Sequence, residues 1–284
     1  MQHTEKIILK KESGKMDHLL RCMKIIGDDT IQRTQLRHRL ELVKAFNIKE
    51  GMRILEIGCG QGDTTVALAD QVGDTGHVMA IDIAHPDYGA PVTLGEAANT
   101  IKASPLGERI TFSFETDLLD LTVDEPFDIV VLSHSSWYFR DPEQLQRYFT
   151  YCTKLAKRIC IAEWDVHFTE RTQLAHFHAV SILALYSQFV ENDGNIQHVF
   201  SKEQLIQMLG TAGWTPADYK TVDATYLQDG SWETGYVLSV EQDFAAAPLT
   251  IQTLVRTYYD LLRACLAPAE SLNSTVILAD LTLD

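Results

Sequence analysis

The chain has 284 residues, 45% of them hydrophobic, and its 24 Lys and Arg against 39 Asp and Glu give a formal net charge of −15. That size can bury the core of one elaborated α/β domain, and that charge disfavours nucleic acids and anionic membrane surfaces as partners. No segment has the about 20 consecutive apolar residues that cross a bilayer, and the five dispersed cysteines form no CxxC pair, so we expect a soluble cytoplasmic protein with reduced thiols.

The first half of the chain alternates between helix-like and strand-like patterns. Residues 15–48 have the apolar spacing of a helix, and residues 53–57 form a short apolar run that ends in glycines, as a buried strand does. Further helices are expected at about 62–72, 92–103 and 142–157, and further strands at 77–83, 110–114, 127–133 and 159–163. Because strands that are joined by helices run parallel, this alternation predicts an α/β fold with a doubly wound, mostly parallel sheet.

The pattern changes after residue 167. Residues 170–190 have nearly helical spacing and are expected to form a cap helix. Another helix begins at Ser201, whose side chain makes a capping box with Gln204, and ends near Gly213. Two β-segments at 216–226 and 233–240 suggest a hairpin through Asp229-Gly230. Last come a helix at about 249–265 and an apolar stretch at 275–283 whose pairing the sequence leaves open.

These patterns divide the chain into four parts. They are an N-terminal helical cap at 1–48, an α/β core at 49–167, a helical lid at 168–200 and a C-terminal part of the core at 201–284 with a final hairpin and an extra helix.

The most informative segment is the turn that follows the first strand, Leu55-Glu56-Ile57-Gly58-Cys59-Gly60-Gln61-Gly62-Asp63. Glycines allow a tight turn and a close approach of the backbone to a ligand, and the next helix presents unpaired N–H groups at the carboxyl edge of the sheet. The spacing is G-x-G-x-G, whereas dinucleotide-binding loops require G-x-G-x-x-G. Glu56 would repel a pyrophosphate but would attract an ammonium or a sulfonium.

The segment LEIGCGQG resembles the first motif of class I S-adenosylmethionine-dependent methyltransferases, and the neighbouring segments match that family in order. The resemblance covers roughly residues 45–165 and 200–240. It implies a seven-stranded Rossmann-like sheet with a helical cap, and S-adenosylmethionine as the cofactor. It also implies that Asp82 binds the ribose hydroxyls and that Asp117 accepts from the adenine amino group while Leu118 covers the ring. The full set of expected cofactor-binding residues is Glu56, Gly58, Cys59, Gly60, Gly62, Asp82, Ile83, Asp117, Leu118, Ser133 and His134.

The acceptor side of the site is expected after the fourth and fifth strands, at the carboxyl edge where open α/β sheets bind ligands. His134 is a candidate general base or an orienting group, and His167 is a second catalytic candidate. Trp137 and Tyr138 either line an apolar acceptor or pack under the cap. His176 and His178 lie on different faces of a helix and lack partners with ligand spacing, so we expect no metal.

The leading hypothesis is an enzyme that methylates an oxygen, nitrogen or carbon atom of a small molecule. Two alternatives remain at this point: an NAD(P)-dependent oxidoreductase, and a non-catalytic regulatory protein that binds S-adenosylmethionine. The sequence also allows a homodimer. It does not identify the acceptor, because fold and function are only loosely tied.

Overall fold

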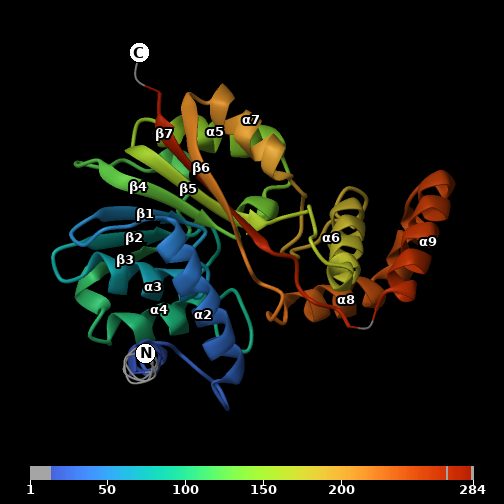
Figure 1. The fold of residues 1–284 in the computed structure, drawn as a ribbon, viewed down its shortest axis with the longest axis horizontal. Coiled ribbons are helices and arrows are strands. Elements are labelled where there is room, and N and C mark those ends of the chain that lie inside the picture. The colour runs from blue at the N-terminus through green and yellow to red at the C-terminus, as the bar shows by residue number, and fades with distance from the viewer. Residues whose placement is uncertain (1–13, 267, 283–284) are drawn as a thin grey trace, which may run out of the picture. The chain divides into compact units, whose positions relative to one another are not determined.

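The structure is a computed structural model that describes residues 14–266 and 268–282. These residues form two compact units: one runs up to Ser133 and includes Tyr151–Cys160, and the other comprises His134–Thr150 and the residues from Ile161 onward. Hydrogen bonds order the strands β3-β2-β1-β4-β5-β7-β6 in a seven-stranded sheet (Figure 1). The expected mostly parallel α/β sheet is confirmed.

The first unit is built on four parallel strands, β1 (Arg53–Ile57), β2 (His77–Ile81), β3 (Ile110–Ser113) and β4 (Phe127–Ser133). Strand β1 pairs with β2 on one side and with β4 on the other. Its last four residues are buried, as the apolar run in the sequence predicts. Because the strands are parallel, their carboxyl ends meet at the same edge of the sheet.

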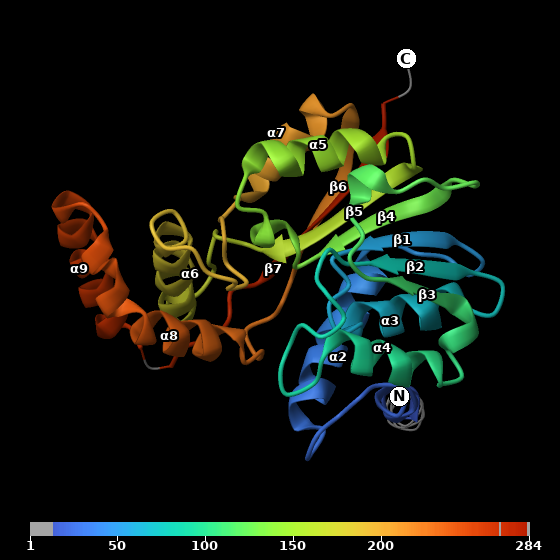
Figure 2. The same ribbon diagram turned by 180° about the vertical axis from the view of Figure 1, so that it is seen from behind.

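The helices of the first unit lie on one side of β1, β2 and β3 in both views (Figures 1 and 2). They are α2 (Thr30–Ala45), α3 (Asp63–Val72) and α4 (Leu94–Lys102), with the short helices η1 (Gly107–Arg109) and η2 (Leu118–Asp120). Helix α4 begins at a capping box that is formed by Thr93 and Glu96.

Residues 15–48, which we expect to be helical, contain two helices rather than an unbroken one. Residues 14–20 are helical, and a separate helix, α2, follows from Thr30. Gly27 adopts a φ of 83°, and the carboxylate of Asp28 accepts a hydrogen bond from the backbone N–H of Thr30 at 2.9 Å. The first helix ends before this point, and the glycine in the left-handed region with the Asx turn that follows it sets the start of α2.

The second unit contains the antiparallel pair β6 (Trp214–Val222) and β7 (Ser274–Leu281), and it shares β5 (Ala156–Trp164) with the first unit. Strand β6 is an edge strand with mostly exposed side chains, and its register shifts between Pro216 and Asp218. Proline and a bulge are typical of edge strands, because they leave no regular row of donors for another chain.

Two helices of the second unit are tied to each other and to β6. They are α5 (Pro142–Cys152) and α7 (Lys202–Thr211), and the side chain of Gln146 donates to the carbonyl of Met208 at 3.0 Å. The indole of Trp214 donates to the carbonyl of Phe149 at 2.8 Å. The capping box of Ser201 and Gln204 is present as predicted. Helix α5 ends at Cys152 rather than near residue 157, because β5 begins at Ala156.

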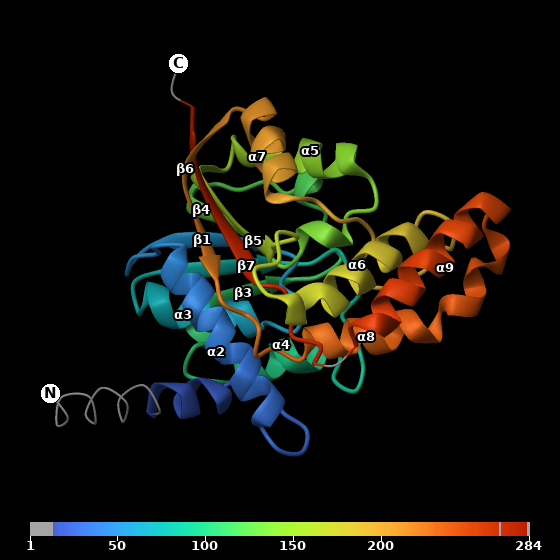
Figure 3. The same cartoon turned by 45° about the vertical axis from the view of Figure 1, so that its right-hand side comes forward.

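Two insertions supply the remaining helices of the second unit (Figure 3). The first insertion follows β5 and contains η4 (Arg171–Gln173) and α6 (Leu174–Tyr186). The second lies between β6 and β7 and contains α8 (Asp229–Ser239), η5 (Glu241–Ala246) and α9 (Leu249–Ala264). They pack together: the Tyr186 hydroxyl donates to Asp243 at 3.2 Å.

The hairpin that we expect between residues 216–226 and 233–240 is wrong. Residues 233–239 belong to α8, and β6 pairs instead with β7. This pairing also answers which strand the apolar stretch at 275–283 pairs with, since β7 includes that stretch as far as Leu281. The Asp229-Gly230 pair resembles a turn in the sequence, yet it opens a helix. A Cβ on Gly230 would lie 2.9 Å from the backbone of Glu270, so this glycine permits close packing rather than a turn.

No helix among the described residues is long and apolar enough to span a membrane. The expected divisions at residues 48, 167 and 200 stay predictions.

Candidate active site

The glycine turn joins β1 to α3 in the first unit. Gly58, Gly60 and Gly62 have φ angles of 76°, 51° and 88°, which lie in the left-handed region that favours glycine. The backbone N–H groups of Gly58 and Cys59 both donate to the carbonyl of Ile81, at 2.9 and 3.1 Å. The turn is therefore fixed to the end of β2.

The side chain of Asp82, at the end of β2, also holds the glycine turn in place. Its Oδ2 accepts a hydrogen bond from the backbone N–H of Gly60 at 2.9 Å, and its Oδ1 accepts one from Ala84 at 2.9 Å. Each carboxylate oxygen retains a further acceptor site. A Cβ on Gly60 would meet no atom within 4 Å, so open space faces this glycine. This combination of open space and acceptors fits a nucleoside with ribose hydroxyls.

Glu56 is buried near the end of β1. Its Oε2 accepts a hydrogen bond from the Thr65 hydroxyl at 2.6 Å. Burial raises the pKa of Glu56 to about 8, which the hydrogen bond from Thr65 and the positive charge of Arg39 partly oppose. The acid is therefore stabilised in its neutral form until a positive charge compensates for its burial.

The other expected cofactor residues of this unit lie at or near the strand ends. Ile83 follows Asp82 and is 63% exposed. Asp117 caps η2 by accepting a hydrogen bond from Leu119 at 2.9 Å, and Leu118 is buried. Ser133 ends β4, where its hydroxyl accepts from Thr64 at 3.4 Å.

Cys59 is a buried residue of the glycine turn. Burial raises the pKa of its thiol, so it remains protonated and fills space rather than acting as a nucleophile.

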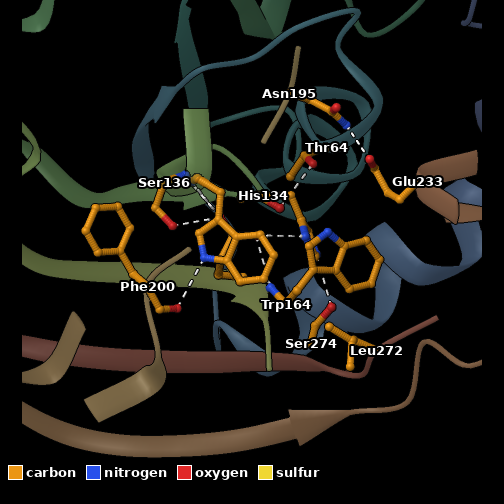
Figure 4. A network of polar contacts seen from close by, with 12 residues as sticks. Thr64, His134, Ser136, Trp164, Asn195, Phe200, Glu233, Leu272 and Ser274 are labelled. Carbon is orange, nitrogen blue, oxygen red and sulfur yellow. Dashed lines mark hydrogen bonds and ion pairs between the residues drawn. The ribbon is translucent and has the colours of Figure 1, made fainter. Parts of the chain in front are cut away.

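In the second unit, His134 begins the loop after β4. It is a non-glycine residue with a φ of 50°, a conformation that is strained and often found at functional sites. Its Nδ1 lies 3.4 Å from Oε1 of Glu163, and its Nε2 lies 3.0 Å from the hydroxyl of Ser274 (Figure 4). The His134 ring is also buried against Trp164, with 4.4 Å between ring centroids.

Glu163, near the end of β5, anchors the loop that His134 begins. Its Oε2 accepts hydrogen bonds from the backbone and hydroxyl of Ser136, at 3.1 and 2.6 Å, and from the backbone of Trp137 at 3.2 Å. The Trp137 indole donates to the carbonyl of Phe200 at 3.2 Å. Trp137 is therefore a packing residue, whereas Tyr138 is 52% exposed.

The two catalytic candidates have different surroundings. His167 is exposed, and its ring nitrogens lie 3.7 Å from carboxylate oxygens of Asp165 and Glu203. His134, in contrast, is enclosed by Glu163 and Ser274.

The other two histidines near this unit's core have structural neighbours. His176 is buried, accepts a hydrogen bond from Leu272 at 2.8 Å and packs against Trp164. The ring of His178 contacts Phe177 and Tyr258. Among the residues that the structure describes, no group of three or more His, Cys, Asp or Glu side chains is placed to hold a metal.

Sequence reasoning missed three residues of these networks and one buried acid outside them. Thr65 and Arg39 act on Glu56, and Ser274 contacts His134 from β7. Glu233 of α8 is a buried acid that the pattern placed in a strand. Only Thr65 carries a local signal, since it follows the glycine turn in the first turn of the next helix.

Comparison with known proteins agrees with this geometry. Residues 54–158 match the family model described as a methyltransferase domain, and residues 10–88 match the model of protein-L-isoaspartate(D-aspartate) O-methyltransferase. Methyltransferase phomM of Diaporthe leptostromiformis is 28% identical over an alignment that covers 69% of this chain and 61% of that protein. The chain thus spans 61% of the length of this curated relative.

Two solved structures extend the comparison. A cyclopropane-fatty-acyl-phospholipid synthase-like protein from Lactobacillus casei is 34% identical, with a TM-score of 0.84 over 94% of this chain and 99% of that one. Magnesium protoporphyrin IX methyltransferase from Synechocystis, solved with bound S-adenosylhomocysteine, shares the fold at 14% identity, with a TM-score of 0.51 over 98% of this chain and all of that one. The chain belongs to the class I S-adenosylmethionine-dependent methyltransferase family.

Proposed function

We propose that this chain transfers the methyl group of S-adenosylmethionine to a small-molecule acceptor. The observation that carries the proposal is the glycine turn, in which Gly60 faces open space and the carboxylate of Asp82 holds its backbone amide. Membership of the methyltransferase family supports the same activity. An NAD(P)-dependent oxidoreductase is disfavoured, because its dinucleotide-binding loop needs the spacing G-x-G-x-x-G.

When bound, S-adenosylmethionine supplies a methyl group on a positively charged sulfur. We propose that Asp82 accepts from the ribose hydroxyls and that the exposed side chain of Ile83 covers one face of the adenine. Asp117 and Leu118 would complete the adenine site. The closely spaced glycines allow the backbone to approach the ligand, and Glu56 becomes ionised as a positive charge approaches.

For the acceptor side, we propose different roles for the two histidines. His134 is fixed between Glu163 and Ser274, which favours a role in positioning the loop after β4. His167 is 58% exposed at its side chain, so a ligand can reach its ring, which favours it as the base if the acceptor has a proton to lose. Much of the catalysis then comes from positioning and from the exclusion of water.

The acceptor is proposed to be partly apolar. The name of the Lactobacillus casei relative refers to a fatty-acyl phospholipid, and the exposed ring of Tyr138 follows the loop that His134 begins. Residues 168–200 are proposed to act as a lid. The net charge of −15 supports a partner other than nucleic acid, and a cytoplasmic homodimer remains part of the proposal.

A thermal-shift titration with S-adenosylmethionine and S-adenosylhomocysteine tests cofactor binding. Both ligands should stabilise the protein in a concentration-dependent way, whereas stabilisation by NAD(P) alone would contradict the assignment. A metabolite-pool screen that is read by mass then tests turnover. Release of S-adenosylhomocysteine with a product 14 Da heavier (roughly one CH₂) supports an enzyme, and binding without turnover supports a regulatory protein.

A further inference from the structure

Glu233 of α8 is a buried acid outside the glycine turn and outside the network of His134. Only 6% of its surface is exposed. The side-chain amide of Asn195, in the loop after α6, donates to its Oε1 at 2.7 Å, and the two side chains point toward each other (Figure 4). This contact joins the first insertion to the second.

The other carboxylate oxygen of Glu233, Oε2, accepts no hydrogen bond from any residue that the structure describes. Oε2 is not fully enclosed by protein atoms, so a ligand can reach it. An acceptor on a largely buried carboxylate that no protein group satisfies takes its partner from solvent or from a ligand. Such a group is typical of a binding site whose ligand supplies the missing partner.

The charges around Glu233 favour a cation as that partner. The pKa of Glu233 is raised to about 7, chiefly by burial and also by the negative charge of Asp229, against the hydrogen bond from Asn195. Glu233 forms no ion pair with a described Lys or Arg. Burial also raises the pKa of Tyr236, and Asp193, Glu233 and Asp243 add to that rise. The local field is therefore negative.

An aromatic ring lies on the same face of α8. Tyr236 follows Glu233 by one helical turn, so their side chains are neighbours. A Cβ on Gly194 would lie 3.7 Å from the Tyr236 hydroxyl, which places the loop of Asn195 beside this ring. The ring is part-exposed, and an aromatic face attracts a cation as a carboxylate does.

The start of α8 is held in place by the segment before β7. The backbone N–H of Gly230 donates to the Ser271 hydroxyl at 2.8 Å, and the carbonyl of Ser271 accepts from Gln173 at 2.9 Å. The start of α8, which carries Glu233, is thus held by hydrogen bonds within the protein, and this lowers the entropic cost of binding.

We propose that Glu233, Asn195 and Tyr236 bind an ammonium group of the acceptor, so that the substrate class is a small, partly apolar amine. This inference rests on the proposed function in one respect only: the molecule that carries the ammonium group also carries the methyl acceptor. The acceptor is a different atom, because a protonated nitrogen has no lone pair to attack the methyl group. Glu233 pairs with the ammonium through Oε2, Asn195 orients the carboxylate through Oε1, and Tyr236 offers its ring.

The test compares n-hexylammonium with n-hexanol, which has the same apolar chain and no charge. Binding to the full-length protein is measured by calorimetry at pH 8 with S-adenosylhomocysteine present. Because a charged hydrogen bond is worth about 1.5–3 kcal/mol, n-hexylammonium should bind about tenfold or more tightly than n-hexanol. The preference should disappear in E233Q, in which the amide can still accept from Asn195. It should persist in E143Q, which removes an exposed acid of α5.

A pH series on the unmodified protein gives a second readout that needs no variant. The affinity for n-hexylammonium should fall below about pH 7, as Glu233 becomes protonated, while the amine remains charged because alkylammonium groups titrate near ~10.4. The affinity for n-hexanol should not change over this range. Equal affinities for the two probes, or an unchanged preference in a folded E233Q, would overturn the inference.

The two proposals fail in distinguishable ways. If S-adenosylhomocysteine does not bind, the proposed function is wrong, and the comparison of the two probes without the nucleoside still tests the cation site. If the nucleoside binds and the probes do not differ, only the cation site is wrong.

Discussion

The carboxylate of Asp82 holds the backbone amide of Gly60, with 2.9 Å between Oδ2 and the nitrogen. The two residues come from the ends of neighbouring parallel strands, β2 and β1, and the bond keeps the glycine turn open on its outer side. One carboxylate therefore shapes the turn and still has acceptor sites for a ligand.

Asp82→Ala should weaken the binding of S-adenosylmethionine by about 1–3 kcal/mol, because a charged acceptor for the ribose hydroxyls is lost. Calorimetry with S-adenosylmethionine and S-adenosylhomocysteine measures this effect, and thermal unfolding shows whether the turn survives. Asp87→Ala, which removes an acid that is 88% exposed at its side chain, is the matched control. Wild-type affinity in a folded Asp82→Ala protein would remove Asp82 from the ribose site.

Gly60→Ala and Gly62→Ala should separate binding from stability. Both residues have a positive φ, so each alanine costs roughly 1–2 kcal/mol in backbone strain. A Cβ at position 62 would also lie 2.6 Å from Cδ1 of Ile101, whereas one at position 60 meets nothing within 4 Å. Gly62→Ala should therefore unfold at lower urea concentration, and Gly60→Ala should chiefly lose cofactor affinity.

The same clash supplies a control for the glycine pair. Ile101→Val removes the Cδ1 atom, so it should restore part of the stability of Gly62→Ala and none of that of Gly60→Ala. An equal loss of stability in Gly60→Ala and Gly62→Ala would show that the contact with Ile101 does not affect stability.

Glu56→Gln should change how stability depends on pH. The folded pKa of Glu56 is about 8, above its usual value of 4.5, so the folded state keeps a proton that the unfolded state has lost. The stability from this group is complete below pH 4.5 and is lost as the pH rises to about 8, with a slope of at most about 1.4 kcal/mol per pH unit. Urea unfolding from pH 5 to 8 should show a smaller decline in Glu56→Gln than in the wild type.

An exposed acid of the same unit provides the comparison for Glu56. Glu125→Gln removes a carboxylate that is mostly exposed, so its stability profile should follow that of the wild type. If the stability of Glu56→Gln depends on pH as that of the wild type does, Glu56 is ionised in the folded protein.

Glu163→Gln should destabilise the loop after β4. Oε2 of Glu163 accepts from Ser136 and Trp137, while Oε1 accepts from the backbone of Trp164 at 3.0 Å. An amide has one oxygen, so its NH₂ group must face N–H donors in either orientation, at a cost of about 1–3 kcal/mol. Urea unfolding measures the loss, with Glu143→Gln as the exposed control, and an equally stable Glu163→Gln protein would contradict the assigned bonds.

Apart from the break between residues 20 and 30, the sequence predicts the first unit well because its signals are local. Strand β4 has the expected bounds, α3 begins within one residue of its expected start, and Gly60 and Asp82 meet as neighbouring parallel strands require. Each of these features depends on residues that are close in sequence or on one rule for parallel strands.

The second unit is less predictable because distant contacts decide its structure. The hydroxyl of Ser271 and the backbone of Glu270 determine that Gly230 opens a helix, and both lie about 40 residues further along the chain. Ser274 reaches His134 from β7, and Asn195 reaches Glu233 from the other insertion. No local pattern encodes these pairs.

The place of β7 between β5 and β6 has a consequence during synthesis. Among the strands that the structure describes, β6 pairs with β7 alone, and residues 223–273 separate the two strands in the sequence. While the ribosome is translating those residues, the nascent chain has no partner for β6, and β5 has an open edge. Unpaired edges are templates for association with other chains, and long-range pairing is slow. The sheet can therefore close only after residues 274–281 have been made and have left the ribosome, and a nascent protein that lacks them is prone to aggregation.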